Sequence, residues 1–402
     1  RLMKRMLTTI GVILFIQIKT VAQQIVFNGF VYELKEDNTA IIVEGDESLF
    51  LPDSVLKIPK TIVYNDSKYK VTEIGMLAFI NKSEIKQLII PKSVKTIHPG
   101  AFLNCINLEE IVLPSRPVWI DLVAFDNTQW YNNQPEGMAY IGNVAYKYKG
   151  DCPEKIELKY GTKAISPGAF YHSEVELEEY NIYIPERESD NLKELILPKG
   201  IEYVAGLQFS SITAIKLPKS VRELGYETFF CCNSLKEIHL PKQLRIIGED
   251  CFSGCENLTS VLLPEKLEAI KEHAFRNCFS LKEITIPDRV KVIPKGLLEC
   301  LAYVRTTPGA KTPLLTKITI GENVEVIDKW AFQGNDLEEI YCNATKPPLI
   351  IHNESNISSD WIAPATYRRD CTEEIILYVP KGCIDAYKKA DGWNIINNIK
   401  EM

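Results

Sequence analysis

Hydrophobic and polar residues follow one pattern that recurs about every 23 residues along this chain. The skeleton is L-x-x-I-x-L-P-x-x-V-x-x-I-x-x-x-A-F-x-x-C-x-x-L, with aliphatic residues exchanging freely. The L-x-x-I-x-L part alternates as a β-strand does, and the remainder predicts a return segment of short helical or 3-10 turns. The skeleton is clearest in residues 89–114 (IIPKSVKTIHPGAFLNCINLEEIVLP), 239–264 (HLPKQLRIIGEDCFSGCENLTSVLLP) and 262–287 (LLPEKLEAIKEHAFRNCFSLKEITIP).

One aromatic residue per repeat allows the register to be followed along the chain. It falls at Phe79, Phe102, Phe125, Phe170, Phe209, Phe229, Phe252, Phe275 and Phe332. The repeat that holds Phe209 is shorter than the others, and we expect the shortening to lie in the loop after this aromatic residue. Insertions interrupt the pattern near residues 129–150, 171–191 and 299–313.

These features predict a repeat solenoid. A single unit is too short to bury its own apolar residues, so neighbouring units must stack. We expect a mainly β right-handed superhelix of about 23-residue coils, with a parallel β-sheet on one face. The repeats span residues 71–345. Residues 23–70 read as an N-terminal β cap, and residues 346–402 read as a C-terminal cap with a last strand and an amphipathic helix.

The repeat motif resembles the BspA-type leucine-rich repeats of bacterial surface and secreted proteins. The opening NGFVYEL…VTEIGMLAF, the insertion WYNNQPEGMAYIG…YKYKG and the closing CNATKPP…LYVPKGCIDAYKKADGW resemble that family as well. The resemblance covers roughly residues 25–400. It implies a curved leucine-rich-repeat solenoid, and adhesion to host or extracellular-matrix proteins is the role usually proposed for such proteins.

Residues 1–22 predict a signal peptide. Arg1, Lys4 and Arg5 form a positive head, LTTIGVILFIQI is a short apolar stretch, and Ala22 ends a small-residue exit. No later stretch is long and apolar enough to cross a bilayer, so we expect no membrane-spanning segment after signal removal. The sequence therefore predicts a secreted or cell-surface protein.

Composition argues against several classes of function. A formal charge of -7 gives no general attraction to nucleic acid. The chain has no G-x-S-x-G elbow, no H-E-x-x-H motif and no phosphate-binding loop, and its five histidines fall in different coils or loops. We therefore expect no enzyme activity, no catalytic residue, no cofactor and no metal site.

The eleven cysteines initially suggest thiol chemistry. Four of them, however, fall three residues after the repeat aromatic: Cys105, Cys232, Cys255 and Cys278. Cys251 stands where other repeats place alanine. We expect these thiols to be small buried groups in stacked columns, because a column points its side chains in parallel and cannot surround zinc. Cys342, Cys371 and Cys383 are better placed for a disulfide.

Outward positions of the predicted strands form two columns across the sheet. One is largely acidic and the other holds aliphatic, β-branched and ring side chains. The columns predict either an ordinary solvated sheet surface or a face that binds a basic, extended or loop-bearing protein partner. The candidate binding residues are Glu194, Glu237, His239, Leu262, Glu283, Glu339 and Tyr341.

The first insertion offers a second candidate site. Trp130 and Tyr131 lie in a loop rich in Asn, Gln, Pro and Gly, where an exposed aromatic pair is suited to stacking on a sugar ring. The same rings are equally suited to folding back over Phe125 and covering the open edge of its coil. A glycan is therefore the alternative partner.

Overall fold

The computed structural model describes residues 23–45, 54–170, 191–300, 315–328, 330–351 and 374–402, and the backbone of short strands at 175–177 and 182–184. The chain divides into two compact units, residues 1–133 and 134–402, and the division falls within the predicted insertion near 129–150. The predicted signal peptide lies outside the described residues. In the described part of the chain, no helix combines the length and apolar character needed to span a membrane.

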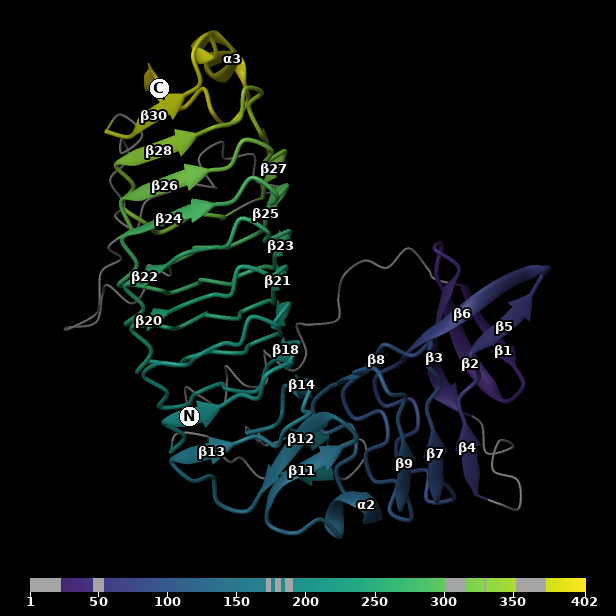
Figure 1. The fold of residues 1–402 in the computed structure, drawn as a ribbon. Coiled ribbons are helices and arrows are strands. Elements are labelled where there is room, and N and C mark those ends of the chain that lie inside the picture. The colour runs from purple at the N-terminus through teal and green to yellow at the C-terminus, as the bar shows by residue number, and fades with distance from the viewer. Residues whose placement is uncertain are drawn as a thin grey trace. The chain divides into compact units, whose positions relative to one another are not determined.

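Unit 1 begins with an antiparallel cap and continues as repeat coils (Figure 1). In the cap, β1 pairs with β2 and β2 with β3, whereas β3 pairs in parallel with β6, which also pairs with β5. The cap strands are β1 (Gln23–Phe27), β2 (Phe30–Leu34), β3 (Thr39–Gly45), β5 (Thr61–Tyr64) and β6 (Ser67–Ile74). The coils contribute β4 (Val55–Lys57), β7 (Gln87–Ile89), β8 (Thr96–Ile97), β9 (Glu110–Val112), β10 (Trp119–Ile120) and the short helix α2 (Gln129–Asn132).

Unit 2 has one front strand in most coils, and these strands pair in parallel as L-x-x-I-x-L predicts, in three separate sheets among the described residues. We call them the front ladder. Glu237 lies beside Ser260 of the next coil, which is a register step of one 23-residue repeat. The front ladder comprises β13 (Lys155–Glu157), β17 (Glu194–Ile196), β20 (Glu237–Ile238), β22 (Ser260–Val261), β24 (Glu283–Ile286), β26 (Lys317–Ile320), β28 (Glu339–Cys342), β30 (Ile376–Val379) and β31 (Asn398–Glu401).

A second row of parallel strands runs along the other side of the unit 2 coils, in two separate sheets, and the sequence did not predict it (Figure 1). We call it the back ladder. It starts from the antiparallel hairpin β11 (Gly137–Ile141)–β12 (Val144–Lys149), because β12 pairs in parallel with β14. The other strands have two residues each: β14 (Ala164–Ile165), β18 (Tyr203–Val204), β19 (Glu223–Leu224), β21 (Ile246–Ile247), β23 (Ala269–Ile270), β25 (Val292–Ile293), β27 (Val326–Ile327) and β29 (Leu349–Ile350).

The segments between the two ladders are successive turns. In unit 1, Ala78 N donates to Gly75 O and Ile80 N donates to Leu77 O, which are the i→i+3 bonds of 3-10 geometry. Other amides of the same segment leave the coil: Phe79 N donates to Ala101 O at 2.8 Å and Asn81 N to Leu103 O at 2.9 Å. Each coil is therefore tied to the next through its turns as well as through its strands.

The core consists of columns of identical side chains. In unit 1 the rings of Phe79 and Phe102 stack at 5.1 Å, and those of Phe102 and Phe125 stack at 5.2 Å, each nearly parallel. In unit 2, Phe252 stacks on Phe229 at 5.2 Å and on Phe275 at 5.1 Å. All of these rings are fully buried. The repeat aromatic thus marks one line through the core of each unit, in which Leu298 takes the place of the ring in one coil of unit 2.

The predicted place of Phe209 in this column is wrong. Leu207 occupies it, because Leu207 N donates to Thr228 O as Phe229 N donates to Cys251 O in the next coil. The chain takes three residues from Val204 to Leu207 and five over the matching stretch of the next coil, so most of the shortening precedes the column position. Gly206 permits this tight path, since a Cβ there would lie 2.5 Å from Ser166 O. Phe209 instead packs edge-on against Phe230.

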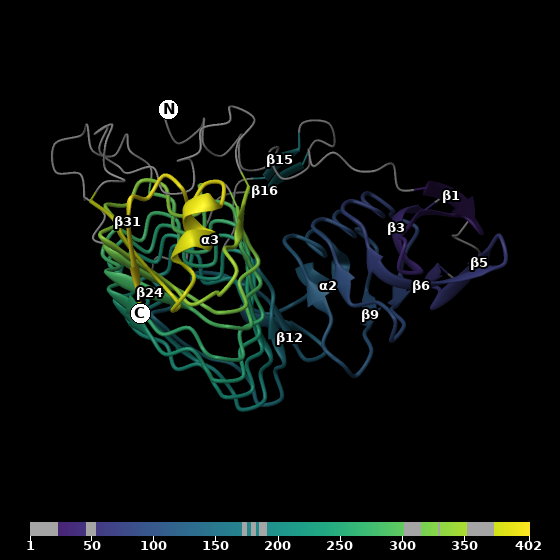
Figure 2. The same ribbon diagram turned by 90° about the horizontal axis from the view of Figure 1, so that it is seen from above.

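The C-terminal end of unit 2 is closed by α3 (Ile384–Lys389) together with β30 and β31 (Figure 2). Tyr387 and Trp393 are fully buried and meet edge to face at 5.1 Å. Trp393 Nε1 donates to Pro348 O at 2.8 Å, and Tyr387 Oη donates to Ala344 O at 2.6 Å. The two rings therefore cover the last coil and donate hydrogen bonds to two of its backbone carbonyls. The described part of the second insertion holds only the antiparallel pair β15 (Val175–Leu177)–β16 (Ile182–Ile184).

One charged contact joins the cap of unit 1 to its coils. Glu73, at the end of β6, accepts hydrogen bonds from Lys35 Nζ at 2.6 Å and from His98 Nε2 at 2.8 Å. The bond from His98, followed by that from Lys35, lowers the pKa of this half-buried carboxyl to about 2. Because the folded-state pKa is below the unfolded one, the stabilisation is complete above about pH 5 and is lost as pH falls toward 2.

We predict that Glu73→Gln flattens the acid dependence of stability. Between pH 7 and pH 3 the free energy of unfolding of the unaltered chain should fall by about 2 kcal/mol more than that of the variant. Urea denaturation at both pH values measures the difference. Glu109→Gln, at an exposed position of the same unit, is the control and should behave as the unaltered chain. Equal acid dependence in the Glu73 and Glu109 variants would contradict the assignment.

Candidate interaction surface

The outward residues of the front ladder in unit 2 form the candidate surface, and we call it the front face. The two predicted columns are in register: Glu283, Lys317 and Glu339 lie side by side on consecutive strands. Thr285, Thr319 and Tyr341 lie side by side in the second column. His239 is bridged to Lys216 of the preceding coil. Glu283–Ile286 alternates exposed and buried residues, and Lys317–Ile320 and Glu339–Cys342 alternate half-buried and buried ones, so these side chains point away from the core.

The middle of the front face combines acids with an exposed apolar side chain. Glu237, His239 and Glu283 are exposed, and Leu262 is 81% exposed. Such exposure of a large aliphatic side chain among charged neighbours is typical of a contact surface when it belongs to a wider patch. Lys317 Nζ lies 3.9 Å from Glu283, and Lys216 lies beside His239. This part of the face therefore carries exposed acids with lysines at its borders.

At the two ends of the front face the acidic and aromatic side chains contact neighbouring residues of the same face. Glu194 pairs with Lys155 of the preceding strand at 2.9 Å, so it is less available to a partner than the sequence suggested. At the other end, Tyr341 stacks on Tyr378 at 4.4 Å, and Lys317 Nζ lies 5.0 Å from the Tyr341 ring centroid. Glu339 accepts a hydrogen bond from Tyr341 Oη at 3.2 Å. These contacts hold the ring pair in one orientation.

Tyr378 and Lys400 extend the second column, and the sequence analysis did not select them. Tyr378 lies beside Tyr341, and Lys400 lies beside Tyr378. Lys400 Nζ is 6.0 Å from the Tyr378 ring centroid. Both residues belong to the C-terminal cap, whose sequence lacks the repeat skeleton. The alternation of Ile376–Val379 was nevertheless a usable signal for this strand.

The rival loop site is organised as a packing element. Trp130 and Tyr131 belong to α2, and Thr128 is the N-cap of this helix. Thr128 Oγ1 accepts a hydrogen bond from Tyr131 N at 3.1 Å. The Trp130 ring meets the Phe125 ring edge to face at 6.4 Å, and Trp130 N donates to Leu108 O at 2.7 Å. Trp130 therefore covers the last ring of the unit 1 aromatic stack, as the alternative interpretation of this loop predicted.

The repeat cysteines are buried and their thiols act as hydrogen-bond donors. Cys255 Sγ donates to Phe229 O of the preceding coil at 3.0 Å, and Cys105 and Cys278 make the equivalent bond. Burial raises the pKa of the Cys255 thiol well above its ordinary range. Cys342 and Cys383 carry free thiols, and Cys371 lies outside the described residues. Each of these three thiols is thus a weak hydrogen-bond donor to the carbonyl of the column ring in the preceding coil, a role that was not predicted from the sequence.

Comparison with known proteins identifies the family. A model of the BspA type leucine rich repeat region matches six copies, over residues 72–186, 186–301 and 310–349. The chain belongs to the BspA-type leucine-rich-repeat family. No curated protein matches it. The family assignment confirms the predicted mainly β leucine-rich-repeat solenoid.

Solved structures of bacterial leucine-rich-repeat proteins also match this BspA-type chain. One from Bacteroides ovatus is 21% identical, with 94% of this chain and 99% of that chain covered and a TM-score of 0.33. A leucine rich cell surface protein from Faecalibacterium prausnitzii is 18% identical, with coverage of 94% and 99% and a TM-score of 0.31. The pneumococcal vaccine antigen PcpA is 18% identical, with coverage of 96% and 100% and a TM-score of 0.32. The assignment rests on the repeats and not on these scores.

We predict that thiol labelling follows burial. In the folded chain N-ethylmaleimide should modify the half-buried Cys152 and Cys383 first, and Cys231 more slowly because burial raises its pKa to about 12. Labelling of the remaining described cysteines should require denaturant: Cys105, Cys232, Cys251, Cys255, Cys278, Cys300 and Cys342. Peptide mass spectrometry over time measures each site. Folded-state labelling of Cys255 as fast as that of Cys383 would contradict the buried column.

We predict that Trp130 acts mainly in packing. Trp130→Ala should lower the free energy of unfolding by about 2 kcal/mol, because removal of the half-buried indole uncovers the edge of the Phe125 ring. Trp130→Phe keeps a ring at this position, so it should retain most of the stability. Urea denaturation measures both variants. A glycan array that shows binding by the unaltered chain, lost in Trp130→Ala without loss of stability, would favour the glycan-binding alternative.

Proposed function

We propose that this chain is a non-catalytic binding protein of the cell exterior, which contacts a protein partner through the front face of unit 2. The observation that carries the proposal is Leu262, which is 81% exposed in the coil that lies between the coils of Glu237 and Glu283 in the sequence. A flat ladder at about 4.8 Å spacing presents these groups as a regular array. Solenoid proteins commonly use such extended surfaces for recognition.

The charge of the front face defines the partner's chemistry. Glu237 and Glu283 favour a partner segment that carries lysine or arginine, and Leu262 favours an apolar side chain beside them. At the C-terminal end the partner meets the Tyr341–Tyr378 ring pair, which suits arginine or a flat apolar group. A host or extracellular-matrix protein with a basic, extended or loop-bearing segment meets these requirements.

Localisation at the cell surface or outside the cell is part of the same proposal. The signal-like residues 1–22 support it, and one matched solved structure is named a cell surface protein. The non-catalytic role is supported by the family, whose repeats supply stacking positions instead of a recurring set of acid, base and nucleophile.

We predict that reversing the charge of the front face removes partner binding. Residues 23–402 are first screened by biolayer interferometry against a panel of purified extracellular-matrix proteins. Each protein that binds is then tested with the variant carrying Glu237→Lys, Glu283→Lys, Glu339→Lys and Tyr341→Ala. Like charges brought together at an interface cost several kcal/mol, so affinity should fall by at least about 100-fold.

The matched control places the same number of charge reversals outside the strands. Glu265→Lys, Glu322→Lys and Glu374→Lys change three exposed acids that are not on the front ladder. This control should bind as the unaltered chain does, and circular dichroism should show both variants folded. Equal binding by the front-face variant and the control would exclude the front face.

A further inference from the structure

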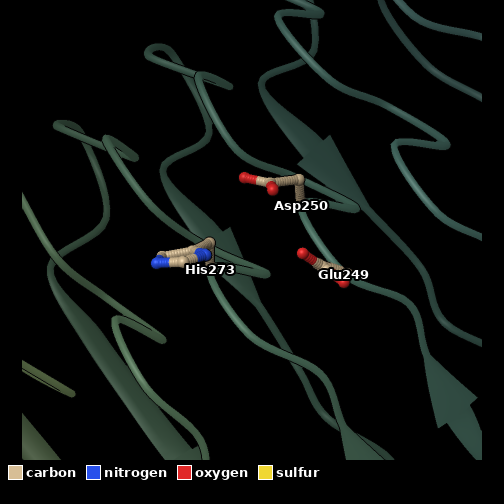
Figure 3. A group of neighbouring side chains, drawn as sticks. All are labelled: Glu249, Asp250 and His273. Atoms are coloured by element: carbon tan, nitrogen blue, oxygen red, sulfur yellow. The ribbon is translucent and has the colours of Figure 1, made fainter. Parts of the chain in front are cut away.

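Three metal-ligating side chains converge at one corner of unit 2, immediately after the back ladder. Glu249 and Asp250 follow β21, and His273 occupies the position of Asp250 one repeat later, after β23. One ligand atom from each residue lies within 4.8 Å of the other two. Figure 3 shows the three side chains, two from one coil and one from the next.

The backbone fixes where these side chains begin. Asp250 N donates to Glu272 O at 3.1 Å, and His273 N donates to Lys295 O at 3.2 Å, so both residues are held by the coil-to-coil hydrogen bonds. Both have positive φ, 49° and 56°. Glycine occupies the same corner position at Gly100 and Gly296. Other coils carry side chains at this corner, such as Leu77 and Glu227, but Asp250 and His273 place two metal-ligating side chains there in consecutive coils.

The next coil leaves room for the His273 ring. Its corner residue is Gly296, and a Cβ there would lie 2.4 Å from His273 Cδ2 and 2.8 Å from Nε2. The imidazole consequently rests against bare backbone. All three candidate ligands are half-buried, so the corner remains open to solvent on one side.

The proximity of the two carboxyl groups to each other and to the imidazole suits a cation. Two neighbouring carboxylates in a partly dry corner are stabilised by a bound positive ion.

We propose that Glu249, Asp250 and His273 bind a divalent transition-metal ion, with zinc as the test ion. Two carboxylates and one imidazole are ligands that zinc accepts, and three protein ligands leave a further position for water or a partner's side chain. Calcium and magnesium prefer all-oxygen sites, so the imidazole selects against them. Because the ligands come from two coils, the ion joins those coils. This site is independent of the front face.

The test is calorimetric titration of residues 23–402 with zinc chloride, after chelator treatment and in the presence of a phosphine reductant. We expect one saturable site and a higher thermal midpoint with zinc, and neither effect with calcium at the same concentration. Asp250→Asn and His273→Asn should each weaken zinc binding at least about tenfold, since even groups that only orient a metal ligand contribute that much. Asparagine tolerates positive φ, so both variants keep the backbone.

Two controls separate this site from other ligands. His239→Asn makes the same substitution on the front face and should bind zinc as the unaltered chain does. Cobalt in place of zinc should give a spectrum without thiolate charge-transfer absorption, because no cysteine belongs to the proposed set. Absence of saturable zinc binding, unchanged binding in the Asp250 and His273 variants, or a thiolate band would each overturn the proposal.

Discussion

The backbone amides of each coil in this protein must hydrogen-bond to carbonyls of neighbouring coils. A single coil holds its strand amides and many of its turn amides outward along the stacking direction, and only another coil can satisfy them. Phe252 N donating to Ala274 O is one such bond, and the same bond recurs at Phe79 and Phe102. Coils of other lengths keep the same bonds by changing the path between bonded positions, as the shortened stretch from Val204 to Leu207 does, since Leu207 N still donates to Thr228 O.

The column side chains follow from that backbone register. Once the amides of successive coils are aligned, identical residues lie one strand spacing apart, which suits stacked rings in the core and hydrogen-bonded amides at the corners. Asn104 Nδ2 donates to Asn81 Oδ1 and Asn127 Nδ2 donates to Asn104 Oδ1, each at 3.0 Å. The same alignment brings Glu283 next to Lys317 on the front face and Asp250 next to His273 at the corner. Structure and candidate chemistry thus have one geometric origin.

The sequence predicted the front ladder and its two outward columns because strict periodicity identifies residues that share a face. It misplaced Phe209, because a shortened coil does not say where its missing residues lie. It missed the two-residue back strands, since one apolar position such as Ile247 carries no alternation to read. Tyr378 escaped because the cap follows no repeat. The corner cluster escaped because histidines spread over different coils suggested no site, whereas His273 lies next to Asp250, a carboxylate of the preceding coil.

The thiol columns have a consequence for how the chain reaches its folded state. Cys232, Cys255 and Cys278 are protected only after successive coils have closed over them. A chain that folds in an oxidising compartment exposes those thiols first, and each nonnative disulfide would lock together coils that belong at fixed separations. Rapid pairing of adjacent coils, which are close in sequence, limits the time available for such oxidation. In such a compartment the rate of coil stacking would compete with the rate of thiol oxidation, and the short sequence separation of adjacent coils favours stacking.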